Sequence, residues 1–226
     1  MGFPGRGADF VLRQISRPRP KNLVLGVNIG KNKDTPLENA VEDYLFLLKL
    51  FATKADYITV NVSSPNTVGL RQLQERQVLD YLLHQICAER SRLSQLPNEK
   101  IPILVKLSPD LTDPQLDDAL QVILANQMDG VIATNTTISR EGLNSPLANE
   151  QGGLSGNPLF ERSLRMVDKI YLRTGGKLPI IGVGGLSDAS GVQRMMDAGA
   201  MLVQIYTGLL YEGPGIVKRI IHNLQT

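Results

Sequence analysis

The sequence is poor in the residues that make disulfides, metal sites and catalytic triads. Its 226 residues include one cysteine, Cys87, two histidines, His84 and His222, and no tryptophan. One cysteine excludes an internal disulfide and is typical of a reducing compartment. Two histidines and one cysteine cannot by themselves make a zinc site, so we predict no metal centre. His84 lies within a helical pattern, and a serine–histidine triad has no support.

Excess charge and long apolar segments are also missing. The 24 basic and 22 acidic side chains leave a net charge of +2, which gives no electrostatic reason to expect nucleic acid as a partner. The longest apolar runs, Tyr44–Leu48 and Leu178–Val183, are much shorter than the ~20 residues of a membrane span. The opening residues MGFPGRGADF lack the apolar core of a signal peptide. We therefore expect no membrane segment in this chain, and its 42% hydrophobic content suffices for the core of one domain.

Six short apolar runs rich in branched residues are present, and each ends at polar residues or glycine. The runs are Leu23–Asn28, Tyr57–Val62, Ile103–Leu107, Gly130–Thr134, Pro179–Val183 and Leu202–Tyr206. Near-continuous hydrophobicity without strict alternation is typical of parallel strands that are buried on both faces. The segments between the runs have helical spacing, so the sequence predicts six strand–helix units of one parallel α/β fold.

Local signals predict where several helices begin. A short helix is expected at Asp9–Ile15. Thr35 to Glu38 matches a capping box with proline at the first helical position. Further start signals are Asp113-Pro114, Asn157-Pro158 and Gly213-Pro214. The residues of the last helix that we expect to face inward are Ile216, Ile220 and Ile221.

Two architectures fit such units, an open doubly wound sheet and a closed (β/α)8 TIM barrel. Polar residues follow the expected strands at Asn28, Asn61 to Asn66, Lys106, Thr134-Asn135, Gly184-Gly185 and Tyr206-Thr207. A barrel gathers functional residues at the carboxyl ends of its strands, whereas an open sheet concentrates them near one switch point. The pattern therefore favours the TIM barrel. With six units instead of eight, we expect residues 1–226 to form a single barrel domain that lacks the first two strands and leaves strand edges exposed.

Two neighbouring segments carry a pattern suited to phosphate. Ile181 to Asp188 (IGVGGLSD) leaves a strand and enters a helix, which places glycine N–H groups and a helix N-terminus together. The next strand ends at Tyr206-Thr207-Gly208, and barrels often bind phosphate between their last two loops. A tight turn alone would also explain the glycines, but the second glycine-bearing loop favours phosphate binding.

Carboxamides and one lysine form a second set of candidates. Asn61 and Asn66 lie in the segment NVSSPNT at a strand end, and Asn28 and Asn135 lie at two other strand ends. Carboxamides both donate and accept hydrogen bonds, so they suit a pyrimidine ring or a flavin edge, although asparagine also favours loops in general. Lys106 lies inside the apolar run ILVKL, where a lysine is costly unless its ammonium meets an anion or reaches water.

Several segments, in order along the chain, are similar to those of one known family. They are GVNIGKNKDTP, ADYITVNVSSPNTVGLRQLQ, VKLSPDLT, GVIATNTT, GGLSGNPL, PIIGVGGLSD and AGAMLVQIYTGLLYEGP. The sequence thereby resembles the quinone-linked (class 2) dihydroorotate dehydrogenases. The resemblance implies an FMN-binding (β/α)8 barrel that oxidises dihydroorotate to orotate in de novo pyrimidine (UMP) biosynthesis. It also implies that electrons pass from FMN to a quinone.

The resemblance assigns roles to individual residues. Ser64 falls on the catalytic base, which takes the C5 proton of dihydroorotate while the C6 hydride moves to the flavin; related soluble enzymes have cysteine there. Matches to substrate-binding positions are Phe3, Asn61, Asn66, Asn135 and Thr136. Matches to flavin-binding positions are Asn28, Asn61, Lys106, Thr134, Gly156, Gly185, Tyr206 and Thr207. Residues 138–156 are expected to form part of a lid or a flavin-covering loop.

The sequence departs from the family pattern near its beginning. Met1-Gly2-Phe3 resembles a substrate-contacting segment, but Pro4 stands where asparagine is usual, and the preceding asparagine and arginine are absent. The family's first strand, with its substrate-binding lysine, and its N-terminal helices, which dock on the membrane and admit quinone, are not in this sequence. Peripheral attachment to the mitochondrial inner membrane or the bacterial cytoplasmic membrane is thus implied for a full-length parent only.

Three hypotheses follow from these observations. The first is an active dihydroorotate dehydrogenase, and the second is a truncated, catalytically inactive fragment or isoform of that enzyme. The third keeps the barrel but changes the chemistry, to a phosphate-binding isomerase or another flavin barrel that acts on pyrimidines.

Overall fold

The computed structural model describes residues 5–94 and 100–224, and its centre is a six-stranded sheet. The strands are β1 (Gly26–Ile29), β2 (Tyr57–Asn61), β3 (Ile103–Leu107), β4 (Gly130–Ala133), β5 (Ile180–Val183) and β6 (Leu202–Gln204). They lie in sequence order, and each neighbouring pair is parallel. Each strand overlaps one of the predicted apolar runs. The prediction of a parallel α/β fold with six βα units is therefore confirmed.

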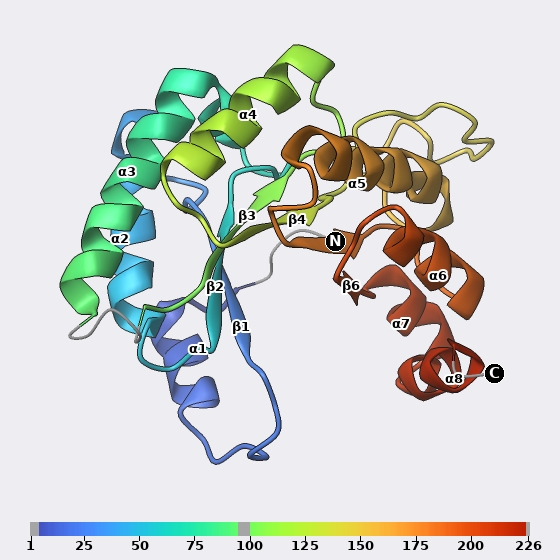
Figure 1. Ribbon diagram of the computed structural model, residues 1–226, viewed down its shortest axis with the longest axis horizontal. Coiled ribbons are helices and arrows are strands. Elements are labelled where there is room, and N and C mark those ends of the chain that lie inside the picture. Colours follow the sequence, from blue (N-terminus) through green and yellow to red (C-terminus); the bar gives the residue numbers. More distant parts are fainter. Residues whose placement is uncertain (1–4, 95–99, 225–226) are drawn as a thin grey trace.

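Helix α1 precedes β1, and helices α2 to α6 lie on the outer side of the curled sheet (Figure 1). The α-helices are α1 (Ala8–Ile15), α2 (Ala40–Phe51), α3 (Arg76–Leu93), α4 (Asp113–Ala125), α5 (Phe160–Thr174), α6 (Ala189–Asp197), α7 (Thr207–Glu212) and α8 (Gly215–Leu224). Short 3-10 helices are η1 (Leu37–Asn39), η2 (Leu70–Gln74) and η4 (Asn157–Leu159). Among the residues that the structure describes, no helix is long and apolar enough to cross a membrane.

The two faces of the sheet have different surroundings, and β3 shows how the sequence produces them. Ile103, Val105 and Leu107 belong to the large core between the sheet and the helices. Leu104 packs instead with Ile132, Ile181 and Val183 in a small cluster on the inner face. Because side chains alternate along a strand, Lys106 shares the inner face with Leu104. The alternation therefore sends the one lysine of β3 to the concave side of the sheet.

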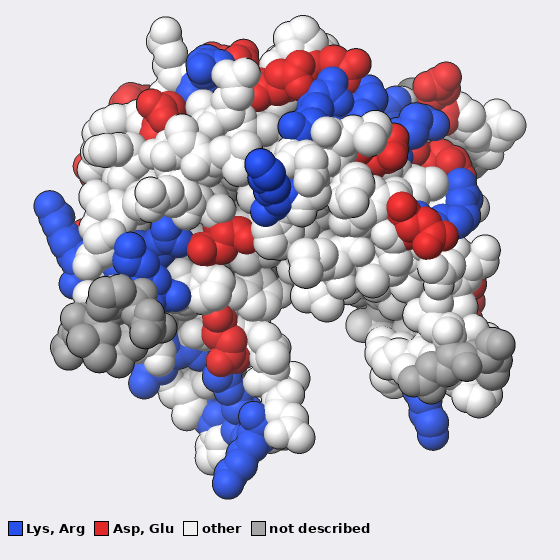
Figure 2. All heavy atoms as spheres, viewed as in Figure 1, with Lys and Arg blue, Asp and Glu red and all other residues white. Residues whose placement is uncertain are grey.

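The described sheet is open at both edges, β1 and β6. In Figure 2 a notch separates the end formed by α1 and the loop after it from the end formed by α7 and α8. Apolar side chains are exposed at the β6 end, where Leu202 is 63% and Tyr211 is 86% accessible. A curved parallel sheet with helices on its outer side matches a portion of a TIM barrel.

The predicted start of a helix at Asp113-Pro114 is confirmed, since α4 begins at Asp113, but its capping residue and two other local predictions were wrong. Thr35 does not cap a helix, because η1 precedes α2 and moves the helix start beyond its reach; its carbonyl accepts from Lys31 Nζ at 2.5 Å. Helix α4 is capped by Thr112, not Asp113, through a reciprocal box with Gln115. In α8, Ile216 and Ile220 are buried as predicted, but Ile221 is 51% exposed, one position past the inward face.

Candidate active site

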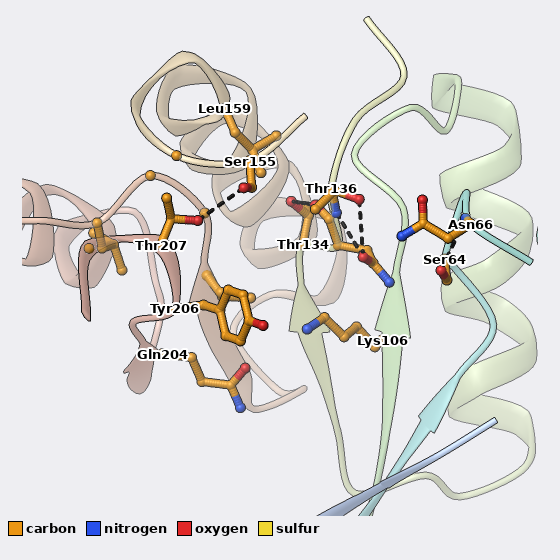
Figure 3. A pocket seen from close by; sticks show the side chains of 17 residues that line it. Ser64, Asn66, Lys106, Thr134, Thr136, Ser155, Leu159, Gln204, Tyr206 and Thr207 are labelled. Atoms are coloured by element: carbon orange, nitrogen blue, oxygen red, sulfur yellow. Dashed lines mark hydrogen bonds between the residues drawn. The ribbon is translucent and has the colours of Figure 1, made fainter. Parts of the chain in front are cut away.

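A cavity of about 260 Å³ lies at the carboxyl ends of the inner strands, where barrel proteins place their active sites (Figure 3). It brings together ten of the residues predicted as site residues. These are Ser64, Asn66, Lys106, Thr134, Asn135, Thr136, Gly156, Gly185, Tyr206 and Thr207. They come from the loops after β2, β4, β5 and β6, from β3 itself and from the segment before η4. Residues far apart in the sequence thus share one space.

Of the predicted site residues that the structure describes, Asn28 and Asn61 do not line this cavity. Asn28 and Asn61 line a second cavity of about 720 Å³ beside β1 and α1, and Asn66 lines both spaces. Asn28 is exposed in the edge strand β1, so the structure does not bring it to the first cavity. Phe3 lies outside the described residues.

Asn61 is nevertheless tied to the first cavity by hydrogen bonds. Its Oδ1 accepts from Asn135 Nδ2 at 3.1 Å and from Ser63 N and Oγ at 3.3 and 3.2 Å. Asn135 Nδ2 also donates to Ser63 Oγ at 3.0 Å, while Asn135 Oδ1 accepts from Thr136 N at 2.8 Å. The carbonyl end of Asn61 is thus occupied by protein donors. Its NH2 group has no hydrogen-bond partner within the described chain and can donate to a ligand.

The backbone of Asn61 is held from the helix side. Tyr44 of α2 is fully buried, and its hydroxyl donates to the carbonyl oxygen of Asn61 at 2.8 Å. Burial raises the pKa of the Tyr44 hydroxyl far above its usual value, so the group remains a neutral donor across the physiological range. Tyr44 therefore fixes the end of β2 from outside the cavity.

Ser64 lies at the cavity with its side chain almost enclosed. The residue is 2% exposed, and its Oγ accepts a hydrogen bond from Asn66 N at 3.2 Å. Within the part of the chain that the structure describes, no histidine, lysine or carboxylate forms a hydrogen bond with the Ser64 hydroxyl. The structure holds the hydroxyl in place but provides no basic group beside it.

Lys106 reaches from β3 into the cavity, on the side toward Gln204 and Tyr206 (Figure 3). Burial lowers the pKa of its ammonium below the ordinary value, and no ion pair or hydrogen bond of Lys106 occurs among residues 5–94 and 100–224. An ammonium in that position is stabilised by an anionic ligand. The arrangement favours the ligand-facing interpretation of Lys106 over a structural one.

The glycines after β5 are required by close packing. Gly185 has φ +71°, and a Cβ on it would lie 2.7 Å from Phe160 Cβ and 2.9 Å from the Gly156 carbonyl oxygen. The backbone after β5 therefore passes directly against the start of α5, and both loops line the cavity together with Thr207. Thr207 Oγ1 and Ser155 Oγ are joined at 3.0 Å, which connects the start of α7 to the segment before η4.

One part of the phosphate prediction was wrong. Asp188 caps α6 with its own carboxylate, which accepts from Gly191 N at 2.7 Å, and none of residues 187–191 lines the cavity. The two residues after Leu186 carry the chain away from the cavity before α6 begins. The groups on this side that line the cavity and could donate to a phosphate are those of the loop at Gly184 and Gly185 and of the first residues of α7, Thr207 and Gly208, and not those at the N-terminus of α6.

Sequence reasoning missed some lining residues, and one of them carried a usable signal. Gln204 lies inside the predicted apolar run Leu202–Tyr206, just as Lys106 lies inside its run, and both line the cavity. Leu159 also lines it, but nothing in its local sequence distinguishes it, whereas Ser155, another lining residue, lies within the predicted covering loop of residues 138–156. Among the described residues, no group of three or more His, Cys, Asp or Glu side chains is placed to hold a metal ion.

Sequential parallel βα units with a polar cavity at their strand ends define a protein of the (β/α)-barrel type. The chain belongs to the dihydroorotate dehydrogenase family, whose sequence profile matches residues 1–226. It is 47% identical over 227 residues to a dihydroorotate dehydrogenase (quinone) of Vibrio parahaemolyticus, with 99% of this chain and 67% of the relative covered. A protein of the same name from Flavobacterium lutescens is 45% identical over 226 residues, with 100% and 65% covered.

Solved structures agree with this assignment. A dihydroorotate dehydrogenase (DHODH) from Eimeria tenella, in complex with ferulenol, superposes on this chain with a TM-score of 0.91 at 36% sequence identity. The match covers 99% of this chain and 65% of the Eimeria chain. The ligand-free type from the same organism gives a TM-score of 0.91 at 38% identity, with 99% and 67% covered. The chain thus spans about two thirds of the length of the relatives that it matches.

Proposed function

We propose that this chain carries the active site of a flavin-dependent dihydroorotate dehydrogenase, which oxidises dihydroorotate to orotate in pyrimidine biosynthesis. The observation that carries the proposal is one cavity in a member of this family, which brings together Ser64, the carboxamides of Asn66 and Asn135, and a lysine, Lys106, with no ion pair among the described residues. A quinone is proposed as the electron acceptor because the curated relatives carry "quinone" in their names. A peripheral membrane location of the whole protein is part of the same proposal.

The residues present fit an FMN cofactor. The ammonium of Lys106 has no anionic partner in the described chain, and the backbone of Gly184 and Gly185, which lines the cavity, is packed so closely against Ser163 and Phe160 that neither position has room for a Cβ. Lys106 and Thr134 would hold the flavin ring, while Gly185 and Thr207 would hold the phosphate end. Bound FMN supplies a hydride acceptor for the substrate and a carrier of electrons toward the quinone. Lys106 would stabilise negative charge on the reduced ring in a site shielded from water.

The carboxamides are proposed to bind the pyrimidine ring. Asn61 has free N–H donors, and Asn66 Nδ2 has no protein acceptor within the described residues. Asn66 Oδ1 accepts from Gly153 N at 3.3 Å, which connects the substrate side to the loop of residues 138–156. A pyrimidine with alternating carbonyl and N–H groups is complementary to such a set. The loop then acts as the proposed cover of the site.

Ser64 is proposed to remove the C5 proton of dihydroorotate. The hydrogen on C6 would leave with the electron pair of its bond, as a hydride that bound FMN accepts. The hydrogen on C5 would leave as a proton to Ser64 Oγ, and the electron pair of the C5–H bond would form the C5–C6 double bond of orotate. A serine hydroxyl is a weak base at neutral pH, and Ser64 has no basic partner in the described chain. The proton transfer must therefore occur in step with hydride departure, or the Ser64 proton must pass onward to solvent.

A second candidate is a catalytically inactive chain with the same fold. The open β1 and β6 edges, and Asn28 lying outside the first cavity, favour it. The two candidates are separated by mixing the purified chain with FMN and dihydroorotate and following orotate formation with a quinone acceptor. Formation of orotate that depends on FMN supports the enzyme. Retention of FMN without orotate, or no retention of FMN, supports the inactive chain.

A further inference from the structure

One arginine behind the cavity connects the loops that follow β2 and β4. Arg71, in η2, donates from Nε to the Ser63 carbonyl oxygen at 3.2 Å and from Nη2 to the Thr136 carbonyl oxygen at 2.9 Å. Its third contact runs from Nη1 to Asp110 Oδ2 at 2.9 Å. A guanidinium offers donors in one rigid plane, so the three partners are held in a fixed relation to one another.

Asp110, in the loop after β3, completes this connection. Its Oδ2 accepts from Arg71 and from the backbone N of Ile138 at 2.9 Å. Its Oδ1 accepts from the hydroxyl of Thr137 and from Arg162 Nη1 at 3.2 Å. Four donors match the acceptor capacity of one carboxylate. The side chain of Asp110 is only 14% exposed and that of Arg71 is 23% exposed, so these contacts are stronger than surface ion pairs.

The two carbonyl groups that Arg71 binds lie directly beside residues that line the cavity. The Ser63 carbonyl belongs to the peptide unit that enters Ser64, and the Thr136 carbonyl belongs to the unit that follows Thr136. Ser64 and Thr136 both line the cavity, whereas Arg71 and Asp110 do not. The guanidinium of Arg71 thus holds the loop after β2 and the loop after β4 at a fixed distance from each other. This contact matters because loops are the most mobile parts of such a fold.

We propose that Arg71 and Asp110 are positioning residues, which act through Ser63 and Thr136 to hold Ser64 against the substrate-binding wall. The catalytic part of this inference rests on the proposed function. The geometric part stands without it, because it rests on hydrogen bonds between residues of the chain itself. A lysine at position 71 keeps the charge but offers no planar fork, so it cannot replace all three contacts.

The first experiment measures hydrogen–deuterium exchange of the ligand-free chain and of Arg71→Lys. We expect exchange of the Asn66 and Ile138 amides to rise about tenfold or more, because the loops that carry them lose their shared anchor, while the strands keep wild-type exchange. The matched control is Arg76→Lys, at the start of α3, because Arg76 pairs with Asp118 on the surface and has no contact with the cavity loops. Its exchange should stay within about twofold of wild type.

The positioning inference is overturned if both loops in Arg71→Lys exchange at the wild-type rate. It is also overturned if the whole sheet exchanges faster to the same degree, because that result means a general loss of stability. Asp110→Asn provides a second variant, and its protection loss should centre on Ile138, whose amide donates directly to the carboxylate.

The second experiment tests the catalytic consequence with FMN and dihydroorotate. We expect Arg71→Lys to lower kcat about tenfold or more, because the proposed base Ser64 moves. The KM for dihydroorotate should change by less than about threefold, because Arg71 does not contact the side chains of Asn61 and Asn66 that are proposed to bind the pyrimidine. A rise in KM with unchanged kcat would overturn the catalytic part. If the wild-type chain forms no orotate, the proposed function fails, and the exchange experiment still decides whether Arg71 and Asp110 position the two loops.

Discussion

The two sides of the cavity differ in how their polar groups are satisfied. On the side of β2 and β4, Asn61, Ser63 and Asn135 bond to one another, and Tyr44 holds the strand end from behind. On the side of β5 and β6, the wall is glycine-rich loop, and Tyr206 is 61% exposed. Lys106 lies between the two sides without a partner in the described chain. We infer that the proposed substrate side is preformed, whereas the proposed flavin side depends on its ligand.

The largest effect is expected on the preformed side, from Ser64→Ala. Removal of the proposed base should slow reduction of bound flavin by dihydroorotate about 10²–10⁴-fold, while FMN stays bound. Stopped-flow absorbance of the flavin measures this rate. The control is Ser91→Ala, because the Ser91 hydroxyl only bonds a carbonyl of its own helix. Reduction at a near-normal rate in Ser64→Ala removes Ser64 from the role of base.

On the flavin side, Gly185→Ala should lower the free energy of unfolding by about 1–3 kcal/mol and abolish FMN retention, because the added Cβ enters the start of α5. Thermal unfolding and the bound flavin absorbance measure the two effects. Gly142→Ala is the matched control, since Gly142 has a similar φ of +72° but open space around a Cβ. If both variants lose equal stability and both retain FMN, close packing at Gly185 does not shape the cavity.

Tyr44→Phe tests whether the preformed side is held from the helix. Loss of the hydroxyl leaves the buried Asn61 carbonyl without its donor, so the free energy of unfolding should fall by about 1–3 kcal/mol. Urea unfolding measures this change, and Tyr81→Phe serves as the control because Tyr81 is 59% exposed. An unchanged midpoint in Tyr44→Phe would show that the strand end does not need this hydrogen bond.

The smallest effect, and one of opposite sign, is expected from Lys106→Met. Burial lowers the pKa of Lys106 in the folded state below the ordinary value of 10.5, so the unfolded chain binds more protons between the folded-state pKa and 10.5. The penalty of burying the charge is therefore fully present below the folded-state pKa and is relieved as pH rises through that window. The ligand-free variant should be more stable than wild type by about 1 kcal/mol at neutral pH, with the gain shrinking toward pH 10.5.

The same variant should bind FMN more weakly, because the proposed charge partner of the flavin is lost. Urea unfolding at several pH values and FMN titration measure the two changes. Lower stability of ligand-free Lys106→Met at neutral pH would mean that Lys106 has a stabilising partner in the folded chain. That result would contradict the contrast between a preformed and a ligand-dependent side.

Much of the fold was predictable because it rests on local patterns. Buried parallel strands leave apolar runs, and a lysine within such a run must face either the core or the cavity, so Lys106 could be identified from its neighbours alone. In the structure Lys106 lies on the inner face with Leu104, because side chains two residues apart on a strand point to the same face. The ends of helices were less predictable, because η1 before α2 and the capping by Thr112 depend on single backbone turns.

The network behind the cavity could not be predicted from local sequence. Arg71 meets Asp110 across 39 residues and the Thr136 carbonyl across 65, and nothing in the segment around Arg71 indicates those distant partners. The assignment of Asn28 to a second cavity has the same cause, since it depends on where the edge strand lies relative to the other loops. Local motifs predicted residues that line the cavity but not those that hold the cavity loops in place.

The most direct test of the account is the visible absorbance spectrum of the chain with FMN under anaerobic conditions, before and after dihydroorotate is added. The account predicts that FMN stays with the protein through desalting and that its absorbance near the flavin maximum bleaches on addition of substrate. A chain that retains no FMN, or that retains oxidised FMN unchanged by dihydroorotate, would contradict the proposal that these six strands carry a working active site.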